Sequence, residues 1–478
     1  MHAAVDRALT HHDHLDNAMS RNASMVTKGF LGLPLLREIR EDPLAAATRL
    51  QHACGEVAEL SILFRRIVYF FGPEAVRKVL VDHHDDFERE PRLLRIFESF
   101  QGRNVLTTEG DDWERQRRLL TPAFSPKRMS GYMALMQAAI ERCVHEELPT
   151  SPGQQADIDV DAFTTRVTMD VILRTLFSHE SSREETRQAS VAIRALSRQS
   201  MREVYWALVP PEWFPYPGRA EMRGHLRTLQ RLIAGHVEAR SRRRSECHSE
   251  DEHPGGDVLD MMLAAGDGDS PLTPQEVLDN CMLLFGAGFD TSASALTWWI
   301  GVMATHPEVQ EALQREVDAA YRDAVDLATM ARLPLLNATI KEAMRLYPPS
   351  TALFTRVAKR DVEIAGVAVR KGTLVAAPIW QIHRNARYFP DPDRFAPARF
   401  LPDAPAIPRG AFMPFGAGPR FCLGQQFASV EIALVAAHLV RHFDLGLASG
   451  DALPAPFVDL ALKPRTPLNV RFVRRDTA

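Results

Sequence analysis

The spacing of apolar residues predicts helices along most of the chain. Patterns with a helical period cover residues 42–54, 111–123, 129–148, 161–178, 183–208, 219–244, 274–305 and 424–443, and shorter helices are expected after Pro73, after Pro307 and around 334–347. Strand-like runs occupy 57–63, 66–71 and parts of 351–380, and 454–473 is typical of a small hairpin. Residues 83–108 show no clear period and are predicted to form a long irregular loop, which in a compact protein is often functional.

This order of elements predicts one mainly helical domain with a minor β region. No internal repeat or low-complexity linker divides the chain of 478 residues, so the domain is expected to extend over residues 40–478. Residues 1–39 are expected to be a partly disordered N-terminal tail. A connection rich in proline and aromatic residues is expected at 210–217, and an exposed polar loop at 245–256.

One apolar stretch is long enough to cross a membrane. It covers residues 281–304, and Asp290 lies near its middle. A charged residue there would cost roughly 2.5–3.5 kcal/mol on membrane insertion. Amphipathic helices precede and follow it, so a buried core helix is favoured. The N-terminus is polar and has no apolar signal region, which predicts a cytoplasmic protein without a membrane anchor.

Composition narrows the class of protein further. The formal net charge is −4 and no long basic run occurs, so nothing favours nucleic-acid binding. The five cysteines are widely spaced and form no CxxC pair, which argues against a disulfide framework or a zinc site and fits a reducing compartment. His11, His12 and His14 are candidate metal ligands, although a polar tail is the simpler interpretation.

The most distinctive stretch surrounds Cys422. It is the loop FGAGPRFCLG at 415–424, rich in glycine and proline, which leads directly into the helix predicted at 424–443. The positive end of a helix dipole, backbone N–H groups and the charge of Arg420 all favour a thiolate over a thiol. Glycines also permit tight turns and a close approach of the backbone to a flat ligand. A buried structural cysteine is the alternative interpretation.

This loop resembles, position by position, the haem-thiolate loop of the cytochrome P450 family. The fixed positions of that motif are occupied by Phe415, Gly418, Arg420, Cys422 and Gly424. The resemblance implies the cytochrome P450 fold, a triangular helical prism with a long central helix and small sheets. It also implies a haem b whose iron takes the Cys422 thiolate as its axial ligand, with Phe415 and Gly416 contacting the haem.

A Glu-x-x-Arg helix supports the same resemblance. Glu342 and Arg345 are three residues apart and share a helix face, where a surface ion pair is the simplest interpretation. Arg399 follows in a Pro-x-Arg-Phe segment. In the family, such a helix and segment form a buried charge network behind the haem loop. The resemblance therefore implies a supporting role for Glu342, Arg345 and Arg399.

The segment AGFDT at 287–291 resembles the oxygen-activation motif of the family. Gly286 and Gly288 each cost a helix about 1 kcal/mol relative to alanine, and a polar pair in mid-helix invites a local break in the helix. The resemblance implies that Thr291 hydrogen-bonds bound dioxygen and that Asp290 helps to relay protons to it. A kink with a satisfied aspartate is the alternative interpretation.

Three further positions resemble the family's partners for the haem propionates. Trp113 and Arg117 are four residues apart on one predicted helix and share a face, and Arg356 lies in a strand-like run. Together with Arg420 they would supply three guanidinium groups for two carboxylates. An ordinary half-buried tryptophan with a surface arginine is the simpler interpretation of the first pair. His383 is expected to be structural.

The substrate pocket is expected to be mainly apolar, which favours a lipophilic substrate such as a fatty acid, terpenoid or steroid. Arg92 or Arg95 is a candidate for binding a carboxylate, although a solvated arginine is the simpler interpretation. The pocket is expected to include the 83–108 loop, the region of Trp213, and Phe97, Leu284, Phe285, Ala287, Leu353, Phe354 and Phe457.

The resemblance implies a monooxygenase that inserts one atom of dioxygen into such a substrate. No residues are left over for a flavin or iron–sulfur module, so a ferredoxin or flavodoxin with its NAD(P)H reductase is the expected electron donor. The resemblance is to soluble bacterial members of the family, and the protein is expected to be a monomer. A docking face is predicted from Arg115, Arg118, Lys127, Arg128 and Arg409. Two alternatives stay open. One is a haem-thiolate isomerase, dehydratase or peroxygenase on the same fold, which Asp290 and Thr291 argue against. The other is a non-catalytic haem- or lipid-binding protein.

Overall fold

The computed structural model describes residues 24–26, 32–180, 182–204, 218–246, 256–264, 271–320 and 326–476. These residues form two compact units, each assembled from separate stretches of the chain. The sheet unit comprises the described parts of Met1–Leu93, with Thr351–Asp393 and Ala406–Cys422. The helical unit comprises Leu94–Ser350, Arg394–Pro405 and Leu423–Ala478, again in their described parts. Because the units interleave along the sequence, neither is a contiguous domain, and the boundary predicted at residue 40 stays a prediction.

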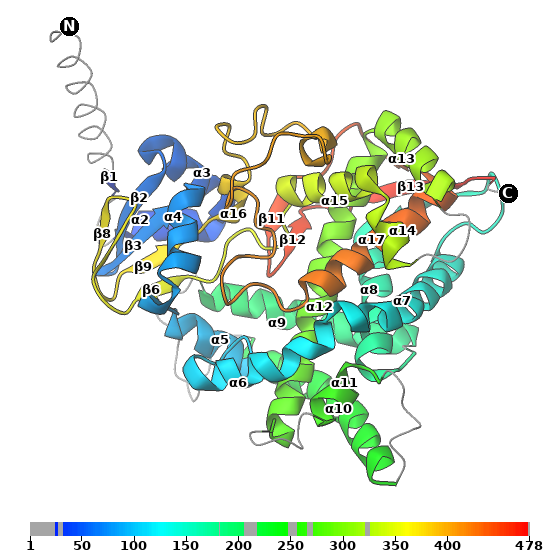
Figure 1. Ribbon diagram of the computed structural model, residues 1–478, viewed down its shortest axis with the longest axis horizontal. Helices are drawn as coiled ribbons and strands as arrows, with labels where there is room; N and C mark the ends of the chain where they lie inside the picture. The colour runs from blue at the N-terminus through cyan, green and yellow to red at the C-terminus, as the bar shows by residue number, and fades with distance from the viewer. Residues whose placement is uncertain are drawn as a thin grey trace, which may run out of the picture. The chain divides into compact units, whose positions relative to one another are not determined.

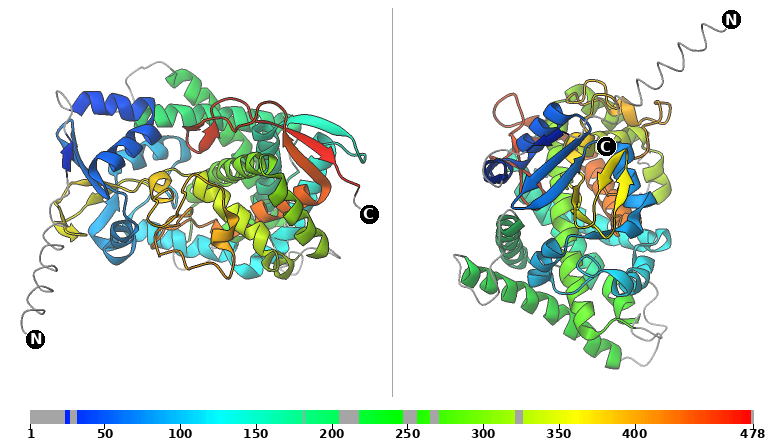
Figure 2. Two further views of the ribbon diagram at one scale, coloured as in Figure 1. Left: turned by 90° about the horizontal axis from the view of Figure 1, so that it is seen from above. Right: turned by 90° about the vertical axis from the view of Figure 1, so that its left-hand side faces the viewer.

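A six-stranded sheet organises the sheet unit, with the strand order β1-β2-β3-β9-β6-β4. β2 and β3 correspond to the two predicted strand-like runs and pair antiparallel, and β3 pairs parallel to β9, with Ile67 opposite Leu374. The strand bounds are β1 Ser24–Val26, β2 Val57–Ile62, β3 Arg65–Phe70, β4 Phe87–Arg89, β6 Arg356–Ala358 and β9 Leu374–Ala376. Figure 2 shows this sheet in its right-hand view. The sheet therefore joins two stretches that lie about 300 residues apart in the sequence.

Short helices cover the sheet. α3 (Pro43–Cys54) begins as predicted, because the Asp42 side chain accepts a hydrogen bond from the Ala45 N–H at 2.9 Å. α2 (Leu33–Glu41) and α3 both pack on β2, and α16 (Ile379–Ile382) packs on α3. α4 (Pro73–Arg77) continues into a π-helical turn, η2 (Lys78–Asp82). A two-stranded hairpin, β7 (Val362–Ile364) and β8 (Val367–Val369), completes this unit.

The helical unit is built around α12 (Pro274–Ala304), which contacts α8, α10, α15 and α17 (Figure 1). Its start is fixed by a capping box, in which Thr273 and Glu276 each accept a backbone N–H of the other. The other helices are α6 Gly110–Leu120, α7 Pro126–Glu147, α8 Val160–Phe177, α9 Arg183–Val204, α10 Arg219–Glu246, α11 Val258–Ala264, α13 Pro307–Ala320, α14 Leu327–Ala331, α15 Pro334–Leu346 and α17 Gln425–His442. The prediction of a mainly helical fold with minor sheets is confirmed.

α12 is a core helix, as its sequence predicted. Trp298 and Trp299 are fully buried, and their indole N–H groups donate to the Leu462 carbonyl at 3.0 Å and the Thr339 hydroxyl at 3.1 Å. Among the described residues, no helix has the length and apolar character that a membrane span requires.

Two small sheets close the helical unit. β10 (Phe443–Leu447) and β5 (Gln155–Asp159) both pair antiparallel with β13 (Asn469–Arg474). β11 (Pro456–Val458) and β12 (Leu462–Pro464) form a hairpin. The hairpin predicted at 454–473 is thus only partly right, because its last strand pairs with β5 and β10 instead.

The irregular loop predicted at 83–108 is wrong. This stretch contains β4 and an eleven-residue helix, α5 (Pro91–Gln101). Pro91 is well placed at a helix start, and buried apolar side chains follow at helical spacing. These are Leu93, Leu94, Ile96, Phe97 and Phe100. The charged residues between them obscured a period that is only three turns long.

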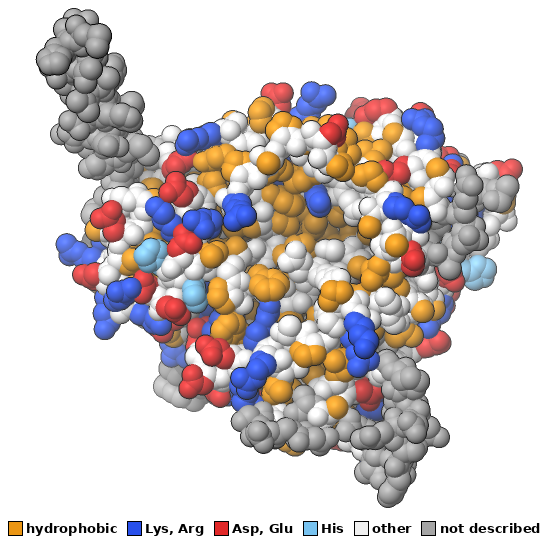
Figure 3. Space-filling view, in the orientation of Figure 1, with side chains coloured by type: hydrophobic (Ala, Val, Ile, Leu, Met, Phe, Trp, Pro, Cys, Tyr) orange, Lys and Arg blue, Asp and Glu red, His pale blue; other side chains and the backbone are white. Residues whose placement is uncertain are grey.

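Charged side chains of both signs are interspersed over the face drawn in Figure 3. This fits the small formal net charge of −4. Several predicted features lie outside the described residues, namely the histidines of the N-terminal tail, the connection at 210–217 with Trp213, and Cys247 in the polar loop.

Candidate functional site

The loop that carries Cys422 is anchored in the core of the sheet unit. Met413, at its start, is buried in the same apolar cluster as Phe70 of β3. The Met413 N–H donates to Nε2 of the buried His383 at 3.0 Å. At the other end, the Cys422 N–H donates to the Phe415 carbonyl at 2.9 Å. These bonds give the Cys422 thiol a defined position.

Two glycines shape this loop. Gly416 has φ of 75° and Gly418 has φ of 73°, a region that side chains disfavour. A Cβ on Gly418 would lie 1.9 Å from the carbonyl oxygen of Leu80 in η2, whereas a Cβ on Gly416 would come no closer than 3.6 Å to Leu353. Gly418 therefore allows the loop to pack on η2. Gly424 has φ of −86° and no neighbour within 4 Å of such a Cβ, so the predicted need for a tight turn does not apply there.

Cys422 differs from the other described cysteines. It is exposed, whereas Cys54, Cys143 and Cys281 are buried. Burial raises the pKa of all three buried thiols, and that of Cys143 to about 12, so they stay protonated at neutral pH. Among the cysteines that the structure describes, Cys422 is thus the one suited to act as a thiolate ligand.

Two of the predicted propionate partners belong to the same unit as Cys422. Arg356 is half-buried in β6, and its Nη1 donates to the Phe354 carbonyl at 2.8 Å. The Phe354 ring lies 5.2 Å from the guanidinium carbon of Arg89. Arg420 is half-buried in the Cys422 loop.

The other predicted propionate partners, Trp113 and Arg117, are half-buried on α6 in the helical unit. α6 is held against α12 because Asn280 Nδ2 donates to Gln116 Oε1 at 2.8 Å. Arg115, which was predicted to belong to the docking face, forms an ion pair with Glu276 in the first turn of α12. Its charge is therefore already compensated.

The segment 287–291 lies in the middle of α12, and the helix continues through it without a break. Ala287 and Thr291 are exposed, whereas Asp290 is buried. The Thr291 hydroxyl donates to the Ala287 carbonyl at 2.8 Å, so the predicted local break is replaced by an additional bond to a helical carbonyl. A Cβ on Gly288 would lie 2.9 Å from Ile172, so this glycine allows close packing on α8.

Asp290 is held by a lysine that the sequence analysis missed. The Lys463 ammonium, from β12, lies 2.9 Å from Asp290 and 3.0 Å from Asp161 of α8. Arg194 is a second partner of Asp161, at 2.8 Å. Burial alone would lower the pKa of Lys463, but the charges of Asp290 and Asp161 outweigh burial and raise it. Lys463 is therefore a cation at neutral pH, and Asp290 is ion-paired. No motif in the sequence marks a lysine in so short a strand.

Glu342, Arg345 and Arg399 meet in the interior of the helical unit. Arg345 donates from Nε and one Nη to the two Glu342 carboxylate oxygens, at 2.7 and 2.8 Å, and both side chains are fully buried. The Arg399 Nε and the Ala396 N–H also donate to Glu342 Oε1, at 3.3 and 3.0 Å. The simple interpretation as a surface pair therefore does not hold. Removing one member of a buried set costs about 3–5 kcal/mol.

A second buried carboxyl lies between α17 and α12. Glu431 is 1% exposed, and burial raises its pKa to about 8. The Ser292 hydroxyl of α12 lies near Glu431 and acts to lower its pKa, against the effect of burial. No hydrogen bond of ordinary geometry joins Ser292 and Glu431. Glu431 is therefore mainly protonated at neutral pH. The sequence does not single out Glu431, because it lies nine residues beyond Cys422 at an ordinary position of a helical pattern.

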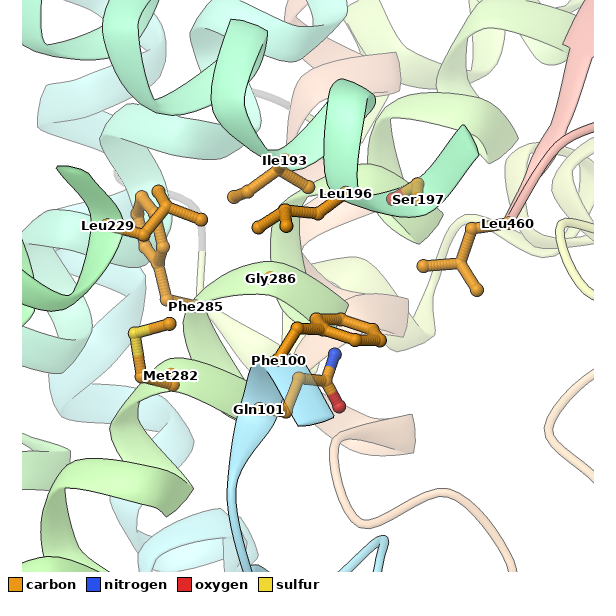
Figure 4. A pocket seen from close by; sticks show the side chains of 10 residues that line it. All are labelled: Phe100, Gln101, Ile193, Leu196, Ser197, Leu229, Met282, Phe285, Gly286 and Leu460. Atoms are coloured by element: carbon orange, nitrogen blue, oxygen red, sulfur yellow. The ribbon is translucent and has the colours of Figure 1, made fainter. Parts of the chain in front are cut away.

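A pocket in the helical unit is lined mainly by apolar side chains (Figure 4). α5 supplies Phe100, α9 supplies Leu196 and α12 supplies Phe285. The complete lining is Phe100, Gln101, Ile193, Leu196, Ser197, Leu229, Met282, Phe285, Gly286 and Leu460. Of the pocket residues predicted from the sequence, Phe285 lines it directly and Phe97 packs on Phe100, with ring centroids 5.6 Å apart.

The remaining predicted pocket residues lie elsewhere. Leu284 and Ala287 are on α12 and Phe457 is in β11, and none of them lines this pocket. Leu353 and Phe354 belong to the sheet unit. Their contribution to a substrate site stays a prediction.

Comparisons with known proteins agree with this fold. The sequence profile of the family "Cytochrome P450" matches residues 29–472. Cytochrome P450 132 of Mycobacterium tuberculosis is 31% identical over 74% of this chain and 77% of its own length. Cytokinin hydroxylase of Arabidopsis thaliana is 30% identical over 82% of this chain and 76% of its own length. Cytochrome P450 monooxygenase ABA2 of Pyricularia oryzae (strain Y34) is 39% identical, over 41% of this chain and 48% of its own length.

An exposed cysteine in such a loop, on a mainly helical fold with small sheets, defines the haem-thiolate class of proteins. The chain belongs to the cytochrome P450 family. Proteins of this family bind haem b. The residues of the sheet unit fit that cofactor, because Cys422 is exposed, unlike the other described cysteines, and because Arg356 and Arg420 are half-buried cations of the kind that pair with propionates.

Proposed function

We propose that this protein is a monooxygenase that inserts one atom of dioxygen into a lipophilic substrate and releases the other atom as water. The Cys422 loop is the single observation that carries the proposal. Its thiol is exposed and held in position by backbone bonds, within a match to the family that covers residues 29–472. When bound, the haem supplies the activation of dioxygen. The side chains of the chain bind the cofactor, orient the substrate and move protons.

In this proposal the Cys422 thiolate would hold the haem iron, and Phe415 and Gly416 would contact the haem beside it. Trp113, Arg117, Arg356 and Arg420 would donate to the propionates. Glu342 of α15 accepts hydrogen bonds from the Ala396 N–H and from Arg399, and these bonds support the stretch of chain that contains both residues.

Proton delivery is assigned to Thr291 and Asp290. The Thr291 hydroxyl is exposed on an otherwise buried stretch of helix, so it can exchange its bond to the Ala287 carbonyl for a bond to another acceptor. Asp290 is the adjacent acid, and Lys463 holds its carboxylate in place. We infer that Thr291 positions the proton and Asp290 restores it from solvent.

The substrate is proposed to be lipophilic, of the fatty acid, terpenoid or steroid kind, because the pocket of Figure 4 is lined by apolar side chains. The name of the Arabidopsis relative describes a hydroxylase, which agrees with a hydroxylation here. A ferredoxin or flavodoxin with its NAD(P)H reductase is the proposed electron donor. A cytoplasmic location, a bacterial source and a monomeric state are retained as proposals from the sequence.

The carbon monoxide spectrum of the reduced protein tests the central claim. A thiolate ligand shifts this absorption band strongly to the red, so the band is expected in the wild type and absent in Cys422→Ala. Oxygen incorporation is then followed with labelled dioxygen in the presence of a reductant and redox proteins. A band that survives in Cys422→Ala would exclude Cys422 as the ligand. Turnover with peroxide but never with dioxygen and reductant would favour a peroxygenase.

A further inference from the structure

The β11–β12 hairpin is attached along one face of α12. Asp290, Ser294 and Trp298 follow one another at a spacing of four residues and therefore share a face of that helix. The Ser294 hydroxyl and the Trp298 indole N–H both donate to the Leu462 carbonyl of β12, at 2.6 and 3.0 Å. The next residue of the strand, Lys463, pairs with Asp290 at 2.9 Å. The hairpin thus lies beside the acid to which proton delivery is assigned.

The turn of this hairpin begins with a second acid, Asp459. Its N–H donates to the Ala461 carbonyl at 3.2 Å, and its Oδ1 accepts from the Leu460 N–H at 3.0 Å. Leu460 also lines the pocket of Figure 4. Asp459 is half-buried, whereas Asp290 is only 5% exposed. Solvent therefore reaches the Asp459 carboxyl more readily than the Asp290 carboxyl.

A route for protons through Lys463 is closed on chemical grounds. Beyond Lys463 lies Asp161, which contacts the ammonium at 3.0 Å and Arg194 at 2.8 Å. Burial would raise the pKa of Asp161, but the charges of Lys463 and Arg194 outweigh burial and lower it. Asp161 therefore stays ionised and Lys463 stays a cation. Neither side chain takes up and releases a proton near neutral pH, which a proton relay must do.

Asp459 has the opposite electrostatic surroundings. Burial and then the negative charge of Asp290 raise its pKa, against the charges of Lys463 and of Arg198 on α9. Asp459 therefore binds a proton in a pH range in which Asp161 is already ionised. The influence of one carboxylate on the other also requires that Asp290 and Asp459 lie within electrostatic reach of each other.

We propose that Asp459 passes protons from solvent to Asp290, so that the β11–β12 hairpin belongs to the proton-delivery site. This inference rests on the proposed function and deepens it. The proton of the Asp459 carboxylic acid moves to the Asp290 carboxylate and leaves Asp459 as a carboxylate, which takes up the next proton from solvent. Asp459 acts through Asp290 and touches no substrate, so it is a positioning residue and not a catalytic one.

Infrared spectroscopy tests the link between the two acids without turnover. The difference between wild type and Asp459→Asn, recorded across a pH titration of the haem-loaded protein, isolates the carboxyl band of Asp459. The same difference is then recorded in an Asp290→Asn background. Loss of the Asp290 charge is expected to move the titration of Asp459 to lower pH. A titration that stays at the same pH in both backgrounds would overturn the proposal.

Turnover tests the role of Asp459 in proton delivery. The haem-loaded protein is supplied with NADPH, a ferredoxin and its reductase, and with dodecanoic acid as the probe substrate. Asp459→Asn keeps an acceptor for the Leu460 N–H but carries no acidic proton. Its rate of product formation is expected to fall roughly tenfold, with more peroxide released per NADPH and a larger solvent deuterium isotope effect. Binding of dodecanoic acid, followed by the spin state of the haem, should not change.

Asp451→Asn is the matched control, because Asp451 is exposed in the loop before β11 and should leave all these values at those of wild type. Asp459→Glu restores a carboxyl and should recover most of the rate. Asp459→Gln takes the place of Asp459→Asn if the latter does not fold.

Wild-type product rate, isotope effect and pH profile in Asp459→Asn would overturn the proposal. Failure of the proposed function is a separate outcome. If wild type forms no product from dodecanoic acid, the infrared titration decides about Asp459, and the carbon monoxide spectrum reports the thiolate ligand independently.

Discussion

At the scale of single residues, Gly418 shows what the loop sequence requires. The sequence predicts that the glycines of this loop permit tight turns and a close approach of the backbone to a flat ligand. In the structure Gly418 has instead a protein neighbour, the Leu80 carbonyl of η2. A resemblance to a motif identifies the position, but the physical reason for the residue depends on which backbone lies beside it.

Replacing Gly418 with alanine is expected to destabilise the protein by more than about 3 kcal/mol. The left-handed conformation costs a side chain about 1–2 kcal/mol, and the Cβ would overlap the Leu80 oxygen. Thermal unfolding and the yield of haem-loaded protein measure the effect. Gly366→Ala is the control, because Gly366 has φ of 78° but no neighbour within 4 Å of a Cβ. Similar losses in both variants would show that contact with Leu80 is not the cause.

Glu431 gives a second prediction, which concerns pH. Its pKa is raised from 4.5 to about 8 in the folded state, so the folded protein binds a proton that the unfolded chain has released. The stabilisation is complete below about pH 4.5 and is lost as the pH rises towards 8. Wild type should therefore lose on the order of 2 kcal/mol relative to Glu431→Gln between pH 6 and pH 8.

Thermal unfolding of both proteins across this pH range provides the measurement. Other titrating groups act equally in both proteins and cancel in the difference. A difference that does not change with pH would mean that Glu431 is ionised in the folded protein.

At the scale of elements, α12 directs three consecutive polar side chains to three different surroundings. Asp290 pairs with Lys463 of β12, Thr291 is exposed, and Ser292 is buried near Glu431 of α17. Side chains that follow one another on a helix point about 100° apart, which makes this separation possible. The segment 287–291 contains Asp290 and Thr291, and Ser292 follows it directly, but the sequence does not show the two partners.

Lys463→Met is expected to cost about 3–5 kcal/mol, because Asp290 loses its cation and Asp161 keeps only Arg194. Chemical or thermal unfolding provides the measurement. Lys463→Arg keeps the charge and should recover a large part of the loss. Lys463→Met combined with Asp290→Asn should be more stable than Lys463→Met alone, and a double variant that is no more stable would show that the Asp290 pair contributes little.

The elements also show how far the sequence can be interpreted. Long periodic stretches such as α8, α12 and α17 were predicted within a few residues, because their apolar pattern extends over many turns. α5 was missed because it has three turns, and β13 was assigned to the wrong partner because its pairing with β5 joins residues about 310 apart. Residues that belong to a motif could be selected from the sequence, and their roles stay predictions. Lys463, Glu431 and Asp459 could not be selected, because burial and the neighbours of a side chain become visible only in three dimensions.

At the scale of the whole molecule, the exposed cations of the predicted docking face concern the electron donor. Arg118 and Lys127 are exposed on α6 and α7, whereas Arg115 is paired with Glu276. We therefore expect Arg118→Glu with Lys127→Glu to slow electron transfer at low salt by roughly tenfold, and the salt dependence to flatten. Stopped-flow reduction by the redox partner provides the measurement.

Glu363→Lys with Asp361→Lys, on the exposed β7 hairpin, is the comparison for a general charge effect. If the rate of electron transfer depends on salt equally in wild type and in the variant with Arg118→Glu and Lys127→Glu, then Arg118 and Lys127 are not part of the docking face.

The pairing of β3 with β9 has a consequence for synthesis in the cell. The sheet unit cannot close until Leu374–Ala376 has left the ribosome, although β3 is complete by residue 70. At about 5–20 residues per second, β2 and β3 wait roughly 15–60 s for their neighbour. During this interval a two-stranded ribbon offers an unpaired edge to other chains. Production of this protein should therefore respond to chaperone supply and to translation speed more than its folded stability alone would suggest.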